Sequence, residues 1–373
     1  MTDSTPRLML NRRTALLSTL ALISPAMPRL GLANPLDPAP PGAIRLDSNE
    51  NPYGPGPLAR AALLKSIDDG CRYADSDIAP LTDALAAREN LNAAQVILGS
   101  GSGELLHMAA LLAAEAGPGG ELIAAQPTFE DLEDFAEKFG VKTHWVGLDK
   151  SHSHDLNALL AAINPRTRLV YVCNPNNPTG TIVPTAEIAA FLQKVPARVL
   201  VLVDEAYLDF VTRADGGSVS QLINQHPNLL VTRTFSKLHG LAGFRIGYGF
   251  ASEGLAARLR AKQLAFWNIG GLRAARASLT DSEFLTATRQ HILSDRRRLE
   301  DWLDQHGLAR SQSQANFVFF NSGRPVKEFN AQLLKFNIKS GRPFARYPTW
   351  ARISIGTRTE IDRLLEALSQ VYV

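Results

Sequence analysis

Three stretches of the sequence place polar residues directly after short apolar runs. Asp204-Glu205-Ala206-Tyr207 follows one run, and Thr234-Phe235-Ser236-Lys237 follows another. The third stretch, residues 173–180, holds two adjacent asparagines between prolines, which fix the backbone and let an amide be aimed with little loss of entropy. A lysine near a carboxylate, an amide and a phenol has the surroundings of an imine-forming nucleophile.

Each of these features also has an ordinary explanation when it stands alone. A lone aspartate at a strand end usually caps a helix, a lone lysine is usually solvated, and an Asn-Pro pair usually marks a turn. Ligands, however, collect at the carboxyl ends of the strands in open α/β sheets. The three stretches therefore predict one site if the apolar runs before them are strands of the same sheet.

The apolar runs alternate with stretches of helical spacing, which indicates an α/β fold. The run at 199–203 is apolar at every position, as a strand covered by helices on both faces requires. Helices are expected between the runs, for example at Glu104–Ala116 and Thr185–Lys194. We expect a mostly parallel, seven-stranded sheet with strands at Val96–Leu98, Glu121–Ala125, Lys142–Val146, Arg168–Cys173, Arg198–Val203, Leu229–Thr232 and Phe244–Phe250.

The pattern changes near residue 280 and predicts a second, smaller α+β domain. A charged helical stretch at Ser294–His306 precedes β-like runs at Asn316–Asn321 and Arg352–Ile355, and an amphipathic helix at Glu360–Gln370 follows. A chain of 373 residues also suits two domains better than one. The predicted division is an export signal at 1–33, an arm at 34–57, a large domain at 58–279 and a small domain at 280–373.

The first 33 residues have the order of basic, apolar and small residues that is typical of an export signal. Asn11-Arg12-Arg13-Thr14 leads into an apolar stretch at 15–26, and Gly31-Leu32-Ala33 is similar to a cleavage site. The paired arginines indicate the twin-arginine type, and the stretch is too short to span a membrane. We therefore expect a periplasmic protein with no membrane contact once the signal is removed. The alternative is a cytoplasmic protein that keeps this segment as its N-terminus.

Composition limits the remaining function classes. The chain is 45% hydrophobic and 20% charged, as soluble globular proteins are, and its net charge of +3 with no long basic run gives no reason to expect nucleic-acid binding. Cys71 and Cys173 do not form a disulfide framework, and we expect two buried thiols. His152 and His154 could bind a metal beside Asp155, but an exposed loop is the expected setting and no metal site is predicted.

The glycines at 99, 101 and 103 are spaced as in a dinucleotide-binding turn. Glu104 stands where that fingerprint needs its third glycine, and no acidic residue follows at a strand end about twenty residues later. The residue order Gly99-Ser100-Gly101-Ser102-Gly103 between a strand and a helix still suits an anion, because backbone N–H groups and the helix dipole point toward it. We therefore expect an anion site here and no dinucleotide.

In this chain order, the motifs resemble those of the class I and II aminotransferases of the fold-type-I pyridoxal-phosphate family, and within it the histidinol-phosphate aminotransferases. The resemblance covers about Leu46 to the C-terminus. It implies pyridoxal 5′-phosphate as the cofactor and the fold-type-I architecture of a large and a small domain. The motifs that carry it are Asn49–Pro55, Asn174–Gly180, Asp204–Tyr207, Ser236-Lys237 with Arg245, and Arg352–Gly356.

The resemblance implies a role for each residue around the cofactor ring. Lys237 would form an imine with the cofactor and then carry the proton, and Asp204 would face the pyridine nitrogen so that the ring can accept electrons. Asn177 and Tyr207 would hydrogen-bond the phenolic oxygen of the ring. Phe129 would stack on the ring, at a position where family members often carry tyrosine.

The resemblance also implies which residues hold the cofactor's phosphate. Family members often have aspartate in place of Gly103, a difference that should leave backbone contacts intact. Tyr73 is similar to a tyrosine that reaches the phosphate in the neighbouring subunit, which implies a homodimer. The phosphate contacts expected within one chain come from Ser102, Gly103, Thr234, Ser236 and Arg245.

Four residues are expected to face the substrate. Arg352 is similar to the arginine that binds the substrate carboxylate, a task that suits a planar guanidinium, and Asn316 and Asn51 would assist it. Arg342 corresponds to an arginine that meets a distal anionic group in the histidinol-phosphate enzymes, although a plain surface arginine is an equal alternative. Gly270 stands where those enzymes usually carry a second asparagine.

The resemblance thus implies a ping-pong aminotransferase that moves an amino group between an amino acid, or the amino-acid-like end of a metabolite, and a 2-oxo acid. A decarboxylase or lyase on the same scaffold is one alternative, since it would share every cofactor residue. Histidinol-phosphate transamination is another, although Gly270 and the export signal speak against it. A cofactor-loaded binding protein without turnover is the third, against which the intact Lys237, Asp204 and Arg352 argue.

Overall fold

The structure is a computed structural model that describes residues 40–115, 117 and 119–372. The predicted export signal at 1–33 and the beginning of the predicted arm lie outside these residues. Among the helices that are described, none combines the length and hydropathy needed to span a bilayer.

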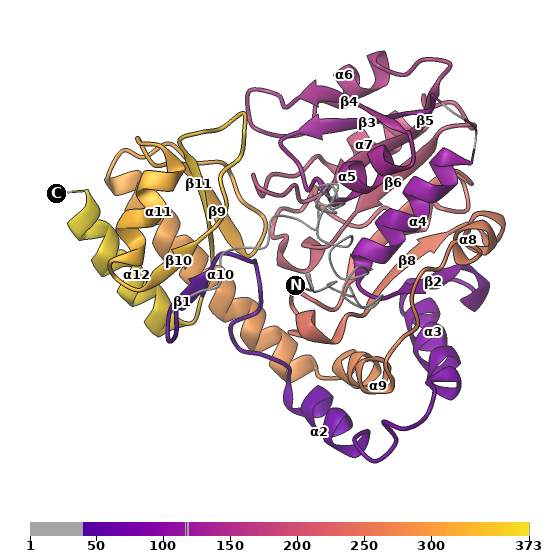
Figure 1. Cartoon of the computed structure of the whole chain (residues 1–373), viewed down its shortest axis with the longest axis horizontal. Coiled ribbons are helices and arrows are strands. Elements are labelled where there is room, and N and C mark those ends of the chain that lie inside the picture. The colour runs from indigo at the N-terminus through magenta and orange to yellow at the C-terminus, as the bar shows by residue number, and fades with distance from the viewer. Residues whose placement is uncertain (1–39, 116, 118, 373) are drawn as a thin grey trace, which may run out of the picture. The chain divides into compact units, whose positions relative to one another are not determined.

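The larger group of elements is built on a seven-stranded sheet with one strand against the general direction (Figure 1). Only the two pairings of β8 (Gly247–Ala251) are antiparallel, and the other pairings in this sheet are parallel. The predicted fold class is therefore confirmed. In order of pairing, the strands are β2 (Val96–Gly99), β8 (Gly247–Ala251), β7 (Leu229–Thr234), β6 (Leu200–Asp204), β5 (Thr167–Cys173), β3 (Glu121–Gln126) and β4 (Lys142–Gly147).

The sheet is apolar on both faces. Successive side chains of a strand point to opposite sides, so a strand that is apolar at every position supplies apolar side chains to both faces. In β5, Leu169, Tyr171 and Cys173 join one core cluster, whereas Val170 and Val172 join another. The first cluster is covered by α4 (Ser102–Ala114), α5 (Asp131–Lys138) and α8 (Glu253–Arg260). The second is covered by α3 (Asp75–Glu89), α6 (Leu156–Ala161), α7 (Thr185–Leu192) and α9 (Ile269–Ser278).

The elements after residue 280 pack around a third apolar core, which includes Leu299, Phe317, Ile353 and Leu364. Strand β9 (Phe317–Asn321) pairs antiparallel with β11 (Trp350–Ser354). Strand β1 (Ile44–Leu46), which lies far away in the sequence, pairs in parallel with β10 (Ile338–Ser340). The predicted domain borders themselves stay a prediction. The elements are α10 (Ser282–Gln305), β9 (Phe317–Asn321), α11 (Val326–Leu334), β10 (Ile338–Ser340), β11 (Trp350–Ser354) and α12 (Arg358–Val371).

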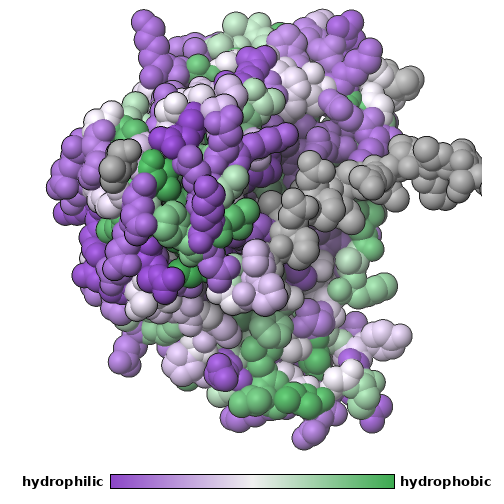
Figure 2. All heavy atoms as spheres, turned by 60° about the vertical axis from the view of Figure 1, so that its left-hand side comes forward, coloured by the Kyte–Doolittle hydropathy of each residue, from purple (hydrophilic) through white to green (hydrophobic). Residues whose placement is uncertain are grey.

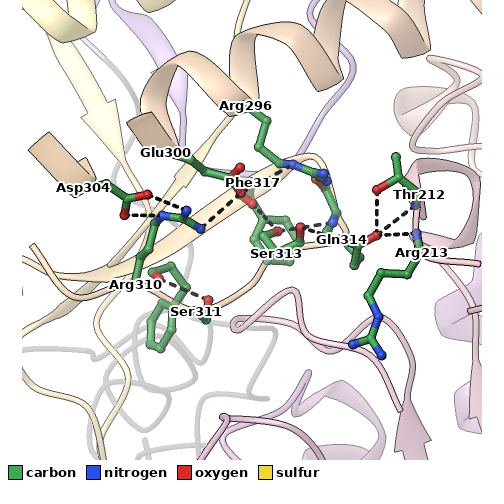
Figure 3. Close-up of polar contacts among 12 residues, drawn as sticks. Thr212, Arg213, Arg296, Glu300, Asp304, Arg310, Ser311, Ser313, Gln314 and Phe317 are labelled. Atoms are coloured by element: carbon green, nitrogen blue, oxygen red, sulfur yellow. Dashed lines mark hydrogen bonds and ion pairs between the residues drawn. The ribbon is translucent and has the colours of Figure 1, made fainter. Parts of the chain in front are cut away.

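A polar segment between α10 and β9 connects this third core to the loops of the sheet (Figure 3). The side-chain oxygen of Gln314 accepts hydrogen bonds from the backbone N–H groups of Thr212 and Arg213, at 2.8 and 3.2 Å. Arg310 pairs with Asp304 on α10 through two hydrogen bonds of 2.8 and 2.7 Å. Hydrogen bonds and an ion pair therefore hold this segment between the two groups of elements.

Candidate active site

The strand register brings the predicted site residues to one edge of the sheet. Cys173 lies opposite Asp204 in the β5–β6 pair, and Asp204 lies opposite Thr232 in the β6–β7 pair. Because β8 runs the other way, it begins where its neighbours end, with Gly247 opposite both Gly99 and Thr234. The turn before β8 therefore reaches the same edge and brings Arg245 with it.

A cavity of about 280 Å³ opens at this edge. The cavity is lined by residues from the ends of β5, β6 and β7, the start of α4, and the segment after β1. The predicted site residues among its lining are Ser102, Gly103, Phe129, Asp204, Tyr207, Thr234, Ser236, Lys237 and Arg245. The sequence-based hypothesis that the strand ends form one site is thus consistent with the geometry.

Lys237 is partly buried at the centre of this arrangement. Its Nζ donates a 3.4 Å hydrogen bond to the backbone oxygen of Ser48 and lies 5.3 Å from the ring centroid of Tyr207. Burial, reinforced by the positive charge of Arg352, lowers the pKa of Lys237 to about 8. A lysine with that pKa has a substantial neutral fraction near physiological pH, as a nucleophilic amine requires.

Asp204, the last residue of β6, is buried, with 3% of its surface exposed. Its two carboxylate oxygens accept hydrogen bonds from Thr232 at 2.9 Å and from Tyr171 at 3.3 Å. Burial raises the pKa of Asp204 to about 6, although these hydrogen bonds oppose the shift. A cationic group bound in the cavity would compensate for this burial and favour the ionised carboxylate.

The start of α4 and the beginning of β8 approach each other closely at one end of the cavity. A Cβ on Gly247 would lie 2.1 Å from the backbone nitrogen of Ser102, and a Cβ on Gly101, where φ is +81°, would lie 2.1 Å from Arg245. The backbone leaves no room for a side chain at Gly247, and the positive φ favours glycine at Gly101. The first N–H groups of a helix have no intrahelical acceptor, so α4 presents donors to this end of the cavity beside the Arg245 guanidinium.

Arg352 on β11 is a buried cation, with 8% of its surface exposed. It donates 2.6 Å hydrogen bonds to the side-chain oxygen of Asn177 and to the backbone oxygen of Asp47. Its Nε is buried and has no hydrogen-bond partner among the described residues. Burial lowers the pKa of Arg352 to about 10. A buried guanidinium with an unused donor favours an anionic ligand.

The segment after β1 completes the cavity from the other side. Tyr207 accepts a 3.1 Å hydrogen bond from the amide of Asn49, and Ser354 binds the same asparagine through two hydrogen bonds. Asn316 donates from its amide to the backbone oxygens of Asn49 and Glu50, at 3.1 and 3.2 Å. These contacts fix the segment across the sheet edge.

Comparison with known proteins gives the family. The family model for aminotransferase class I and II matches residues 41–368. The chain belongs to this family. Members depend on pyridoxal 5′-phosphate, and the chain is an aminotransferase that uses this cofactor.

Relatives in this family are named as histidinol-phosphate aminotransferases. The protein of Bacillus licheniformis is 37% identical over 87% of this chain and 90% of its own length, and that of Brevibacillus brevis is 38% identical over 88% and 90%. The solved structure of the Sinorhizobium meliloti enzyme in complex with pyridoxal-5′-phosphate has a TM-score of 0.82 and 30% identity. The match covers 88% of this chain and 90% of the Sinorhizobium meliloti chain.

Several predicted site residues of the aminotransferase lie outside the cavity lining. Asn51 donates a 2.7 Å hydrogen bond to the backbone oxygen of Leu238, next to Lys237, and Asn316 holds the segment after β1. Tyr73 is 88% exposed. Arg342 forms a 2.8 Å ion pair with Glu130 and is therefore neither isolated nor fully solvated.

Two expectations for residues outside the site are wrong. Cys71 is exposed rather than buried, because it lies in the turns after α2 (Pro57–Lys65), where little packs over it. His154 is buried rather than in an exposed loop, because its ring contacts the backbone oxygen of Cys173 at 3.0 Å beneath the sheet edge. The described residues contain no cluster of three or more potential metal ligands.

Sequence reasoning missed residues that surround the predicted ones. Tyr171 stands two positions before Cys173 on β5, so its side chain points to the same face, where it reaches Asp204. Strand parity could have indicated this contact. Ser48, Glu50 and Asp131 also line the cavity, but the first two lie in a loop and Asp131 begins α5 after one, so their positions depend on tertiary packing.

Proposed function

We propose that the aminotransferase transfers an amino group from an amino acid, or from the amino-acid-like end of a metabolite, to a 2-oxo acid, with Lys237 as the reactive group. The observation that carries this proposal is the position of a partly buried lysine, with its pKa lowered to about 8, in a cavity beside Asp204 and close to Arg352. Lys237 supplies the nucleophile that holds the cofactor. Once displaced by the substrate, its amine is placed to remove and return a proton.

The chemistry of the cavity suits pyridoxal 5′-phosphate. Asp204 offers a buried carboxylate for the ring nitrogen, and Phe129 offers an aromatic face. Asn177 and Tyr207 offer hydrogen bonds to the phenolic oxygen. The bound cofactor would act as an electron sink, and Asp204 would support this by keeping the ring nitrogen protonated. For the phosphate we assign the donors Ser102, Gly103, Thr234, Ser236 and Arg245.

Arg352 is assigned to the carboxylate of the substrate. Its buried Nε without a partner supports this role, since a carboxylate bound there would satisfy the donor and neutralise a buried cation. Asn177, which now accepts from Arg352, would remain beside that carboxylate. Asn316 and Asn51 would contribute indirectly, by keeping the segment after β1 and the backbone next to Lys237 in place.

Reduction of the purified enzyme with borohydride followed by peptide mapping tests the role of Lys237. We expect the cofactor label on Lys237 alone, and none in the Lys237→Ala variant. A label on another lysine would overturn the assignment.

A second candidate substrate is histidinol phosphate, the compound in the relatives' names. Arg342 favours this candidate, since its guanidinium lies against Phe344, whose ring Arg352 also contacts. Histidinol phosphate carries its phosphate in place of the carboxylate of an amino acid, so this anion would meet Arg352, with Arg342 nearby. The glycine at position 270 is the departure that speaks against it.

We propose that the active form is a homodimer. Apolar side chains are exposed on α2, after it, and before α9, and among them Ile67 is 68% exposed and Phe266 88%. Figure 2 shows apolar side chains gathered at the lower end of the view, the level at which α2 lies in Figure 1. A second copy covering this surface would bury them, and Tyr73 would then stand at the interface, where it could reach the other cavity.

We also propose that the enzyme is exported to the periplasm by a twin-arginine signal, already folded and loaded with cofactor. The support is the Arg12-Arg13 pair, the apolar stretch and the small residues at 31–33, all outside the region that matches the family model. Cofactor binding favours the folded state by mass action, which suits transport of a folded protein. Replacing Arg12 and Arg13 by lysine should trap active enzyme in the cytoplasm. A wild type found uncleaved and wholly cytoplasmic by cell fractionation would refute export.

A further inference from the structure

An ion pair joins two segments next to the cavity wall. Arg342 Nη2 lies 2.8 Å from Glu130 Oε2, and the two side chains are 36% and 26% exposed. Glu130 directly follows Phe129 in the cavity wall, whereas Arg342 lies in the loop between β10 and β11. The pair therefore connects the sheet side of the site to the side formed by the third core.

The position of Arg342 relative to Arg352 indicates which part of a substrate would meet this pair. The guanidinium of Arg342 lies 4.5 Å from the ring centroid of Phe344, and that of Arg352 lies 5.8 Å from the same centroid. If Arg352 holds the substrate carboxylate, a side chain that extends past Phe344 ends near Arg342 and Glu130. The pair thus faces the distal group of the substrate.

The charges around this position are balanced rather than positive. Glu130 already occupies Arg342. A distal anion would have to displace Glu130 from Arg342 and then remain beside its carboxylate. A neutral distal group meets no such repulsion, and it leaves the ion pair intact.

We propose that Glu130 is a specificity-determining residue that selects against amino donors with a distal anionic group, and that the enzyme takes donors with neutral side chains. This inference rests on the proposed function and deepens it by naming the substrate class. It predicts that dicarboxylic donors are poor substrates because of Glu130, although Arg342 is present.

The Glu130→Gln variant tests this proposal, because glutamine has nearly the same shape without the charge. Donor pairs that differ in one distal charge are compared, namely glutamate with glutamine and aspartate with asparagine. We expect the ratio of kcat/KM for the anionic donor to that for the neutral donor to rise about tenfold over wild type, mainly through KM. The effect is limited to this size because the pair is partly exposed.

Two further variants guard against a general disturbance of the site. Arg342→Gln leaves Glu130 without its partner, so the same ratio should fall below the wild-type value. Asp304→Asn removes the carboxylate of another arginine pair, at 2.7 Å from Arg310. Neither residue lines the cavity, so this variant should leave the ratio unchanged.

The outcomes separate this proposal from the proposed function. A ratio that stays the same or falls in Glu130→Gln overturns the role of Glu130, provided that the wild type converts at least one donor to its 2-oxo acid. A wild type that converts none of the four donors, nor any other amino acid offered, refutes the aminotransferase reaction itself.

Discussion

Burial moves the pKa values of two charged groups at the cavity in opposite directions. It lowers the pKa of Lys237 to about 8 and raises that of Asp204 to about 6, because burial disfavours the charged form of each. The two groups therefore reach partly neutral states in the same pH range. A cofactor that carries an aldehyde and a basic ring nitrogen would use both, the first through the neutral amine and the second through the carboxylate.

The lowered pKa of Lys237 predicts how fast the cofactor binds covalently at different pH values. Only the neutral amine attacks an aldehyde, so the rate of loading of cofactor-free enzyme should rise with pH and level off above about 8. Stopped-flow absorbance across this range measures the rate. A midpoint near 10.5, the ordinary value for lysine, would contradict the electrostatic account.

At the residue scale, the sequence indicates the groups that follow strands and misses those that depend on packing. Asp204 and Lys237 follow apolar runs, and chain order alone places them at one sheet edge. The pair between Glu130 and Arg342 joins residues 212 positions apart through loops that have no periodic pattern. No local signal in the sequence relates these two positions.

Among the elements, β8 and α4 determine the shape of the cavity end that holds the anion donors. A Cβ on Gly247 would lie 2.1 Å from the nitrogen of Ser102, so Gly247→Ala should push the first turn of α4 away from β8. We expect the affinity for pyridoxal 5′-phosphate to fall about tenfold or more, since backbone donors lose their alignment. Equilibrium titration of the cofactor-free variant measures this.

Gly254→Ala is the matched control for that substitution. A Cβ at Gly254, in the first turn of α8, meets no atom within 4 Å. Its cofactor affinity should equal that of the wild type. Equal affinities in Gly247→Ala and Gly254→Ala would show that the contact between β8 and α4 does not matter for binding.

At the element scale, long apolar patterns were predicted well and short or exposed elements were not. All seven strands of the sheet were expected, but Phe244 belongs to a short 3₁₀ turn and Arg245 adopts a left-handed conformation, so β8 begins only at Gly247. Helix α10 begins at Ser282, twelve residues before the predicted stretch. Its first half buries only Thr288 and Ile292, so the sequence there lacks the apolar pattern that indicates a helix. The three-residue strands β1 and β10 exist through their pairing with each other.

For the whole molecule, the exposed apolar surface predicts association of two copies. Ile67→Glu should shift the enzyme from twice its chain mass of 40.5 kDa toward a single chain, because a charge at a buried interface is costly. Analytical ultracentrifugation measures this, and cofactor affinity should fall with dissociation if Tyr73 completes the partner's site.

Leu334→Glu on α11 provides the control, since Leu334 is exposed but lies on an element of the third core, away from α2 and α9. It should leave the mass unchanged. A wild type that sediments as a single chain at working concentrations, with full activity, would rule out the dimer.

At this scale, the sequence predicted the fold class and the family because several strand-end motifs occur together in one order. The same sequence does not determine the donor, since the residues that would contact its distal group meet only through tertiary packing. The predicted export signal rests on the sequence alone.

The central claim is amino transfer, and a single-turnover reaction tests it most directly. Purified enzyme loaded with pyridoxal 5′-phosphate is mixed with a neutral amino acid in the absence of any acceptor, and the products are measured per subunit. We predict one equivalent of the matching 2-oxo acid, conversion of the cofactor to its amine form, and neither product with Lys237→Ala. Release of carbon dioxide with the cofactor unchanged would contradict the account in favour of a decarboxylase, and the absence of any product from every amino acid tried would leave only a binding protein.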